Sequence, residues 1–165
     1  MADVRRCTAA DLETLWEVGA EGLRHHEARF AAQERGWCDY LLAVDSDASF
    51  VGHVVVRNHS KYEPVLARLG VVPEVNGLAA YPTGRGTGTA LLDAAETLAV
   101  RRGASCIGLA VELSNHGARR LYERCGYVEW GHGEVIDDWE ELANDGTVVA
   151  LHHDVCAYLV LAFGQ

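Results

Sequence analysis

Residues 82–88 read PTGRGTG and separate two stretches of different periodicity. The run before them, 71–80, is extended in character, whereas apolar residues recur at helical spacing from Leu91 to Leu98, and Gly103 is a suitable helix end. Glycines let backbone N–H groups converge on an anion, and a helix N-terminus adds about half a positive charge to that concavity. The stretch therefore predicts a strand, an anion-binding turn and a helix, in that order.

The glycine turn fits neither of the common nucleotide-binding motifs. A P-loop places Lys and then Ser or Thr after its last glycine, whereas Thr89 and Ala90 follow Gly88 here. A dinucleotide fingerprint spaces its glycines as G-x-G-x-x-G, whereas the glycines here are at 84, 86 and 88, so the third comes two residues after the second rather than three. Taken alone, the turn is as typical of a tight loop without a ligand as of an anion site.

A second motif, NHGARRLYERCGY, occupies residues 115–127. It follows a nearly all-apolar strand predicted at 106–113, and Asn115 is placed to cap a helix whose inner face holds Leu121 and Tyr122. Together with the glycine turn, this segment resembles the GNAT superfamily of acyl-CoA-dependent N-acyltransferases, whose members carry N-x-x-A-x-x-L-Y-E-x-x-G-[FY]. Every fixed position of that pattern is matched here.

The resemblance implies a site for acetyl-CoA. In the family the glycine turn grips the pyrophosphate, an Asn meets the cofactor arm, and the strand before the turn aligns its edge with the pantetheine like an added strand. The corresponding residues of this chain are Leu78, Ala79, Ala80, Thr83, Gly84, Arg85, Gly86, Thr87, Gly88, Thr89 and Asn115.

One position departs from the family pattern, whose turn reads [QR]-x-x-G-x-[GA]. If the apolar face of the following helix sets the register, the motif occupies 83–88 and Thr83 stands where Gln or Arg is usual. A literal match starting at Arg85 would misplace that apolar face. The first register is favoured because misplacing a core stripe costs several kcal/mol, more than one phosphate-binding side chain contributes.

The resemblance also implies how the acyl group is transferred. Tyr122 would donate a proton to the departing CoA thiolate, since its phenol has an ordinary pKa near 10. The backbone N–H of Ala79 or Ala80 would polarise the thioester carbonyl. No cysteine is placed as a relay nucleophile, so direct attack by the acceptor is favoured over a covalent route.

Glu74 is the candidate general base. It lies on the strand before the turn, where the family often has a carboxylate that works through water, and strand alternation puts it on the same face as Asn76. A solvated charge at a strand end is an equally weighted alternative. His53 and Glu112 are weaker candidates.

Composition and charge exclude several classes of protein. The 165 residues include 14 basic and 24 acidic side chains, a formal net charge of −10, which argues against nucleic-acid binding. Five cysteines, without a Cys-x-x-Cys pair, predict reduced thiols and a cytoplasmic protein. The apolar stretch 155–163 is too short for a membrane span, and no signal peptide is expected. The histidines at 25–26 and 152–153 lack zinc-site spacing, so no metal is expected.

The predicted elements follow the order β-α-α-β-β-β-α-β-α-β-β over one domain, residues 1–165, an α/β (α+β) architecture. The apolar pattern from Leu12 to Val18 predicts the first helix, and 22–34 the second. Strands are predicted at 4–6, 40–44, 50–57, 71–80, 106–113, 127–130 and 148–161. The resemblance implies a GNAT-like mixed, mostly antiparallel sheet of six to seven strands with about four helices, in which the parallel strands 75–80 and 106–113 splay apart to admit the cofactor.

The function implied is transfer of an acetyl group from acetyl-CoA to a primary amine within a ternary complex. The alternative is a non-catalytic module of the same fold that binds or senses acyl-CoA. The acid-rich segment from Glu134 to Asp145 hints at a cationic acceptor such as a polyamine, an aminoglycoside or a protein amine. A homodimer could form through an exposed final strand at 155–161. The resemblance places Glu21, His25, His26 and Glu27 on helices that cap the acceptor pocket, and Trp130, Trp139, Asp137 and Asp138 could form its other wall. An ordinary polar surface is the slightly favoured alternative for each of these residues.

Overall fold

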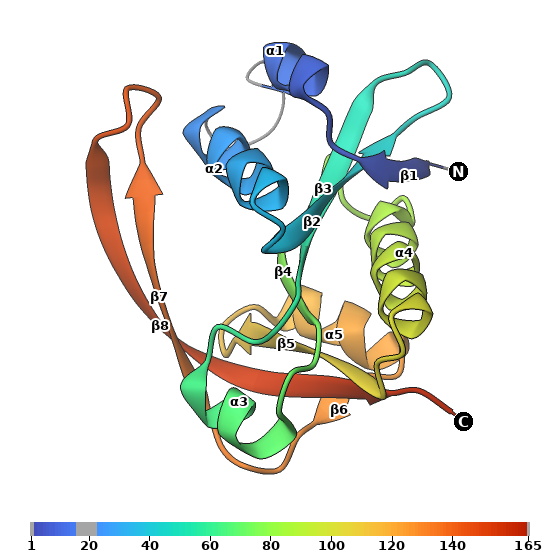
Figure 1. Cartoon of the computed structure of the whole chain (residues 1–165), viewed down its shortest axis with the longest axis vertical. Coiled ribbons are helices and arrows are strands. Elements are labelled where there is room, and N and C mark those ends of the chain that lie inside the picture. The colour runs from blue at the N-terminus through green and yellow to red at the C-terminus, as the bar shows by residue number, and fades with distance from the viewer. Residues whose placement is uncertain (1, 16–22, 165) are drawn as a thin grey trace.

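Eight β-strands form one curved sheet in the computed structural model, which describes residues 2–15 and 23–164 (Figure 1). The strands run in the order β1-β2-β3-β4-β5-β8-β6, and β7 also pairs with β8. All pairs are antiparallel except β4 with β5, which confirms the predicted mixed, mostly antiparallel sheet with one strand more than expected. The bounds are β1 Asp3–Arg6, β2 Cys38–Val44, β3 Phe50–Arg57, β4 Glu74–Ala80, β5 Cys106–Glu112, β6 Val128–Glu129, β7 Val135–Leu142 and β8 Val148–Ala162.

The described helices flank this sheet. They are α1 Leu12–Leu15, α2 Leu23–Glu34, α3 Glu63–Leu69, α4 Thr87–Arg101 and α5 His116–Arg124, with a 3₁₀ turn at Ala9–Asp11. The part of the first predicted helix beyond Leu15, as far as Val18, lies outside the described residues. None of the helices described is long and apolar enough to cross a bilayer.

Strand alternation sends β2 and β3 side chains to two separate cores. One set packs on the buried face of α4, and the other lies beneath α1 and α2, so these helices cover opposite faces of the sheet (Figure 1). The set toward α4 is Leu41, Ala43, Val54 and Val56, and the opposite set is Cys38, Tyr40, Leu42 and Val55. Each fully buried apolar side chain contributes about 1.5–3 kcal/mol, which fixes the register of the sheet.

The parallel strands β4 and β5 part soon after they meet. They pair only at Glu74 with Gly108 and at Val75 with Leu109. The register between β3 and β4 then shifts around Gly77, whose φ of 57° lies in the left-handed region. Such a β-bulge bends a strand, and here it carries the rest of β4 away from β5 (Figure 1). The predicted splay is therefore confirmed.

Two elements were absent from the sequence-based prediction. The acidic segment between the last two predicted strands contains β7, which forms an antiparallel ribbon with the first half of β8. The short helix α3 was also missed, because Pro64 in its first turn resembles a helix break although proline is tolerated there.

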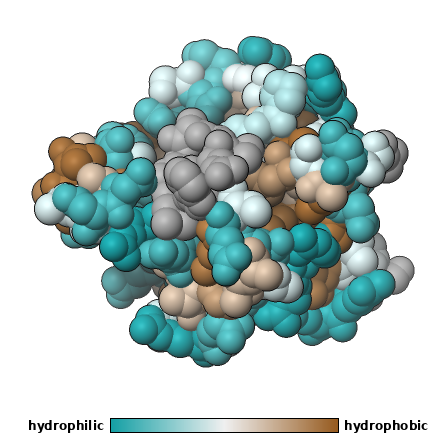
Figure 2. Space-filling model, turned by 90° about the horizontal axis from the view of Figure 1, so that it is seen from above, coloured by the Kyte–Doolittle hydropathy of each residue, from teal (hydrophilic) through white to brown (hydrophobic). Residues whose placement is uncertain are grey.

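The final strand also corrects a prediction. The segment 155–161 is interior to the sheet, since β5 pairs with it along one edge and β6 and β7 along the other. The exposed part of β8 is its first half, where Leu151 is 77% accessible. Figure 2 shows apolar side chains at the protruding end of this ribbon, on the left of the view.

Candidate cofactor and acceptor site

The glycine turn has the backbone geometry of an anion site. Gly84 and Gly86 both have a φ of 80°, and Gly86 is the N-cap residue of α4. The first N–H bonded within the helix belongs to Ala90, which donates to the carbonyl of Gly86 at 3.0 Å. The N–H groups of Thr87, Gly88 and the residue after them therefore have no acceptor within the helix. These donors, next to an exposed turn at 82–86, form a concavity suited to a pyrophosphate.

The helix that follows confirms the face predicted for it. Leu91, Leu92 and Ala95 are fully buried against the sheet. This burial supports the register in which Thr83 begins the motif, because a shifted helix would expose those leucines.

Three elements of the predicted cofactor site meet at Gly88. A Cβ added to this glycine would lie 2.9 Å from Cδ2 of Leu121 on α5 and 3.9 Å from Cδ2 of Leu78 on β4. The start of α4, the end of β4 and the middle of α5 are therefore in contact, and Tyr122 is the next residue along α5. The structure thus brings the two sequence motifs together.

The edge of β4 toward the split carries backbone groups that β5 does not use. On its other edge, Ala79 pairs with His53 and Ala80 with Gly52 of β3. Pairing with β5 ends at Val75, so the residues beyond it present their other edge to the gap between the strands. An extended ligand arm can pair there as an additional strand would.

Tyr122 and Asn115 occupy defined places on α5. Tyr122 is 7% exposed, and burial raises the pKa of its phenol to about 12, so it stays protonated throughout the working range of an enzyme. Asn115 is the N-cap, and its side-chain oxygen accepts the N–H of Ala118 at 3.1 Å. Its amide nitrogen keeps two donors for a ligand.

Glu74, the predicted base, is fully buried rather than solvated. The hydroxyl of Tyr158 donates to its carboxylate at 2.8 Å, and the backbone N–H of Lys61 donates at 3.2 Å. Burial is the main cause that raises the pKa of this carboxyl. Its neighbour on the same face, Asn76, reaches the cavities described below, whereas Glu74 does not line them.

His53, a weaker candidate, lies in a buried aromatic cluster and faces neither the surface nor the cavities. Its ring lies 5.5 Å from that of His26 and 6.2 Å from that of Phe50, and its Nε2 is 3.2 Å from the hydroxyl of Tyr81. The nitrogen Nδ1 of His26 lies 2.5 Å from the hydroxyl of Tyr40. Through His26, this cluster packs α2 against strands β2 and β3.

We expect the buried carboxyl of Glu74 to make stability depend on pH. The folded state holds this proton to higher pH than the unfolded chain, whose ordinary pKa is 4.5. The free energy of unfolding should therefore fall as pH rises from 4.5 through the raised pKa, by at most about 1.4 kcal/mol per pH unit. Glu74→Gln should remove this contribution, as urea unfolding at several pH values would show. Equal pH slopes for both proteins would contradict the assignment.

A cavity of about 750 Å³, the acceptor cavity, opens beside the split between β4 and β5. Carboxylates dominate its wall, with Lys61 and Arg29 as the cations. Lys61 is ion-paired with Asp137. The acidic residues lining the cavity are Glu112, Asp137, Glu140, Glu141 and Asp154.

Some of the residues expected around the acceptor lie in this cavity and others do not. His25, Asp137 and Trp139 line it. The other expected residues that the structure describes, His26, Glu27, Trp130 and Asp138, are absent from its lining, and Glu21 lies outside the described residues. The described residues also contain no group of three potential metal ligands.

Sequence reasoning missed Lys61, Arg29 and Asp154. No motif marks them, and they reach the cavity only because α2, the 58–62 segment and the β7–β8 ribbon meet there.

Comparison with known proteins places this site in a family. The model of the acetyltransferase (GNAT) family matches residues 6–127, so the chain belongs to that family. The resemblance carried by the two motifs is thereby confirmed.

Individual relatives agree with this assignment. Mycothiol acetyltransferase of Salinispora tropica is 35% identical over 106 residues, covering 61% of this chain and 33% of the relative, so the chain spans about a third of that protein's length. A phosphinothricin acetyltransferase of Sinorhizobium meliloti, solved with acetyl-CoA, superposes with a TM-score of 0.67 at 16% identity, covering 99% of this chain and 89% of the other. A ribosomal-protein-alanine N-acetyltransferase of Brucella melitensis gives 0.67 at 16% identity, covering 98% and 99%. At these identities the solved structures support the fold.

Proposed function

We propose that residues 1–165 form a single acyltransferase domain that transfers an acetyl group from acetyl-CoA to a primary amine by direct attack. The observation that carries this proposal is the convergence of the glycine turn, the open edge of β4 and α5 around Gly88. In this arrangement the turn binds the pyrophosphate and the split holds the pantetheine, which directs the thioester toward the acceptor cavity.

The transfer then requires three groups. The neutral amine forms a bond to the thioester carbon, and the N–H of Ala79 or Ala80 stabilises the negative oxygen of the tetrahedral intermediate. When the C–S bond breaks, Tyr122 donates its proton to the CoA thiolate and recovers one from solvent. A phenol with a pKa of about 12 is fully protonated at neutral pH, so its O–H is present as a donor when the thiolate forms next to it.

Glu74 remains the predicted base for the acceptor amine, acting through water. Because its pKa is raised, a base role would make the rate rise with pH through that value, and Glu74→Gln would flatten this acidic limb of the pH–rate profile. If Glu74→Gln leaves the pH–rate profile unaltered but changes the pH dependence of unfolding as described above, Glu74 has a structural role. In that role its hydrogen bond from Tyr158 links β4 to β8.

The charge of the acceptor cavity supports a cationic acceptor. Among the lining residues that the structure describes, five carboxylates against two cations favour a ligand with positive charge, and Glu112 is the last residue of β5. We expect Glu112→Gln to raise the KM for a cationic acceptor by about tenfold, because a charge-assisted contact is lost. Steady-state kinetics with a diamine would measure this. The control Glu34→Gln alters an exposed residue of α2 outside the cavity and should leave KM unchanged.

The alternative is a module that binds acyl-CoA without turnover. Release of free CoA thiol in the presence of an amine panel, followed by mass spectrometry of the product, separates the two. No thiol release with any amine, while acetyl-CoA still raises the Tm, would favour the module.

Two further properties stay proposals. A homodimer would pair through the first half of β8, whose edge away from β7 has no partner strand among the described residues. A cytoplasmic location rests on the cysteine pattern described above.

A further inference from the structure

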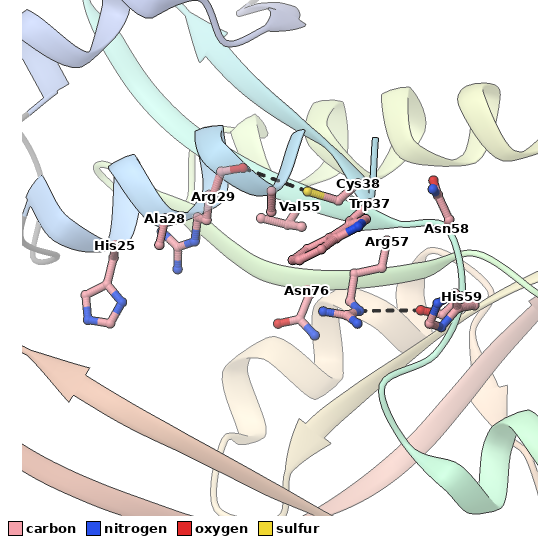
Figure 3. Close-up of a pocket in the computed structure, with 11 residues that line it drawn as sticks. His25, Ala28, Arg29, Trp37, Cys38, Val55, Arg57, Asn58, His59 and Asn76 are labelled. Carbon is pink, nitrogen blue, oxygen red and sulfur yellow. Dashed lines mark hydrogen bonds between the residues drawn. The ribbon is translucent and has the colours of Figure 1, made fainter. Parts of the chain in front are cut away.

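A second cavity, of about 490 Å³, lies beside the acceptor cavity and has the opposite charge. Figure 3 shows the residues that line it. Arg29 and Arg57 line it, and none of its lining residues that the structure describes is a carboxylate; we call it the arginine cavity. In a chain with a formal net charge of −10, a cavity whose described charged lining residues are both arginines differs from its surroundings. The other residues that line it are His25, Ala28, Ala32, Trp37, Cys38, Val55, Asn58, His59 and Asn76.

Arg57 is the cation that points to a ligand. Its Nε donates to the backbone carbonyl of His59 at 3.4 Å, a long bond, and no described carboxylate lies within ion-pair distance of its guanidinium. Glu74 is its register partner on β4. The charge of Arg57 offsets a small part of the rise in pKa that burial causes in that carboxyl. That carboxylate is nevertheless occupied by Tyr158 and the N–H of Lys61. The guanidinium donors of Arg57 are therefore available to an anion.

The arginine cavity adjoins the acceptor cavity. His25, Arg29 and Asn76 line both. Figure 3 shows His25 and Arg29 extending from α2 toward the strands that carry Asn76 and Arg57. A Cβ on Gly77, at the bulge that opens the split, would lie 3.1 Å from a terminal nitrogen of Arg29. One molecule can therefore reach from the split into both cavities.

Trp37 and Asn58 suit this cavity to an organic anion rather than to a bare ion. The indole of Trp37 is 61% exposed and offers an apolar surface, while Asn58 and Asn76 add amide groups. Arg35 packs on that indole with its Cζ 5.1 Å from the ring centroid, but it does not line the cavity.

We propose that the acceptor is zwitterionic, with its amine in the acceptor cavity and an anionic group, a carboxylate or a phosphate, bound by Arg57 in the arginine cavity. This inference rests on the proposed function and narrows its substrate class. The two oxygens of a carboxylate or phosphate match the planar donors of a guanidinium, which gives direction as well as attraction.

The test compares matched acceptors by release of free CoA thiol. Each α-amino acid is paired with the amine that lacks its carboxylate, and each phosphorylated amino alcohol with its unphosphorylated form. We expect kcat/KM to be about 10- to 100-fold higher for the anionic member of at least one pair type, because that is the factor a charge-assisted hydrogen bond contributes. The two pair types distinguish a carboxylate from a phosphate.

Arg57→Gln identifies the residue responsible. We expect it to reduce the preference ratio to about one, whereas Arg57→Lys retains the charge without the planar donors and should keep part of the ratio. Arg35→Gln, the same substitution at an arginine outside the cavity, should keep the wild-type ratio. Thermal unfolding with acetyl-CoA checks that each variant is folded.

The outcomes separate this inference from the proposed function. Turnover without preference for anionic acceptors, or a preference that survives Arg57→Gln, would overturn the inference and leave the acetyltransferase intact. No thiol release with any acceptor would overturn the proposed function itself.

Discussion

Gly86→Asp is expected to abolish the stabilisation that acetyl-CoA gives the protein. At a concentration about 100 times the Kd, bound cofactor should add about 2.7 kcal/mol and raise the Tm by roughly 5–10 °C for a chain of this length. A carboxylate at position 86, beside the free N–H groups at the start of α4, would repel the pyrophosphate. Differential scanning fluorimetry with and without acetyl-CoA measures the shift.

Gly86 is the better of the two glycines for this test. Gly88 packs against Leu121, so any side chain there would also disturb α5, whereas a Cβ at Gly86 meets nothing within 4 Å. The φ of 80° strains most residues, but Asn and Asp tolerate it best. Gly86→Asn is therefore the matched control, and it should retain most of the shift. Equal shifts in both variants would show that the cofactor's phosphates bind elsewhere.

Tyr122→Phe is expected to lower kcat by about 100-fold or more, the usual contribution of a positioned proton donor, while the Kd for acetyl-CoA changes little. The ring stays in its buried place, so only the proton of the hydroxyl is lost. Thiol-release kinetics and calorimetric titration separate the two quantities.

Tyr127→Phe is the control for this experiment. Tyr127 is also buried, its ring centroid lies 6.1 Å from that of Tyr122, and its hydroxyl donates to Glu96 at 3.1 Å. Loss of that hydroxyl should lower stability by about 1 kcal/mol with kcat retained. If Tyr122→Phe keeps wild-type turnover, Tyr122 is not the acid.

The fold was largely predictable because its strongest local signals coincide with its core. The glycine turn and the leucines after it define α4, and the apolar strand followed by Asn115 defines β5 and α5. Those elements carry the buried contacts that fix the register.

The β7–β8 ribbon was not predictable in the same way because side-chain pairs across the strands, rather than burial, hold much of it together. The ring of Trp139 stacks on His152 at 3.9 Å, and Asp138 lies 2.5 Å from His153. Such pairs join residues distant in sequence, so β7 shows little of the alternation that identifies a half-buried strand.

The residues of the site differ in the same way in how far the sequence reveals them. Residues in contiguous motifs, from Leu78 to Thr89 and from Asn115 to Tyr122, could be predicted from the sequence, whereas Arg29, Arg57 and Lys61 come from separate elements that only the fold brings together. The burial of Glu74 was equally hidden, because it depends on Tyr158 approaching from β8.

A co-crystal structure with acetyl-CoA tests the placement of the cofactor most directly. We expect pyrophosphate oxygens on the N–H groups of 84–88, the pantetheine along the open edge of β4, and the sulfur near the hydroxyl of Tyr122. Acetyl-CoA bound at another surface, or β4 and β5 paired along their whole length with no space between them, would contradict it.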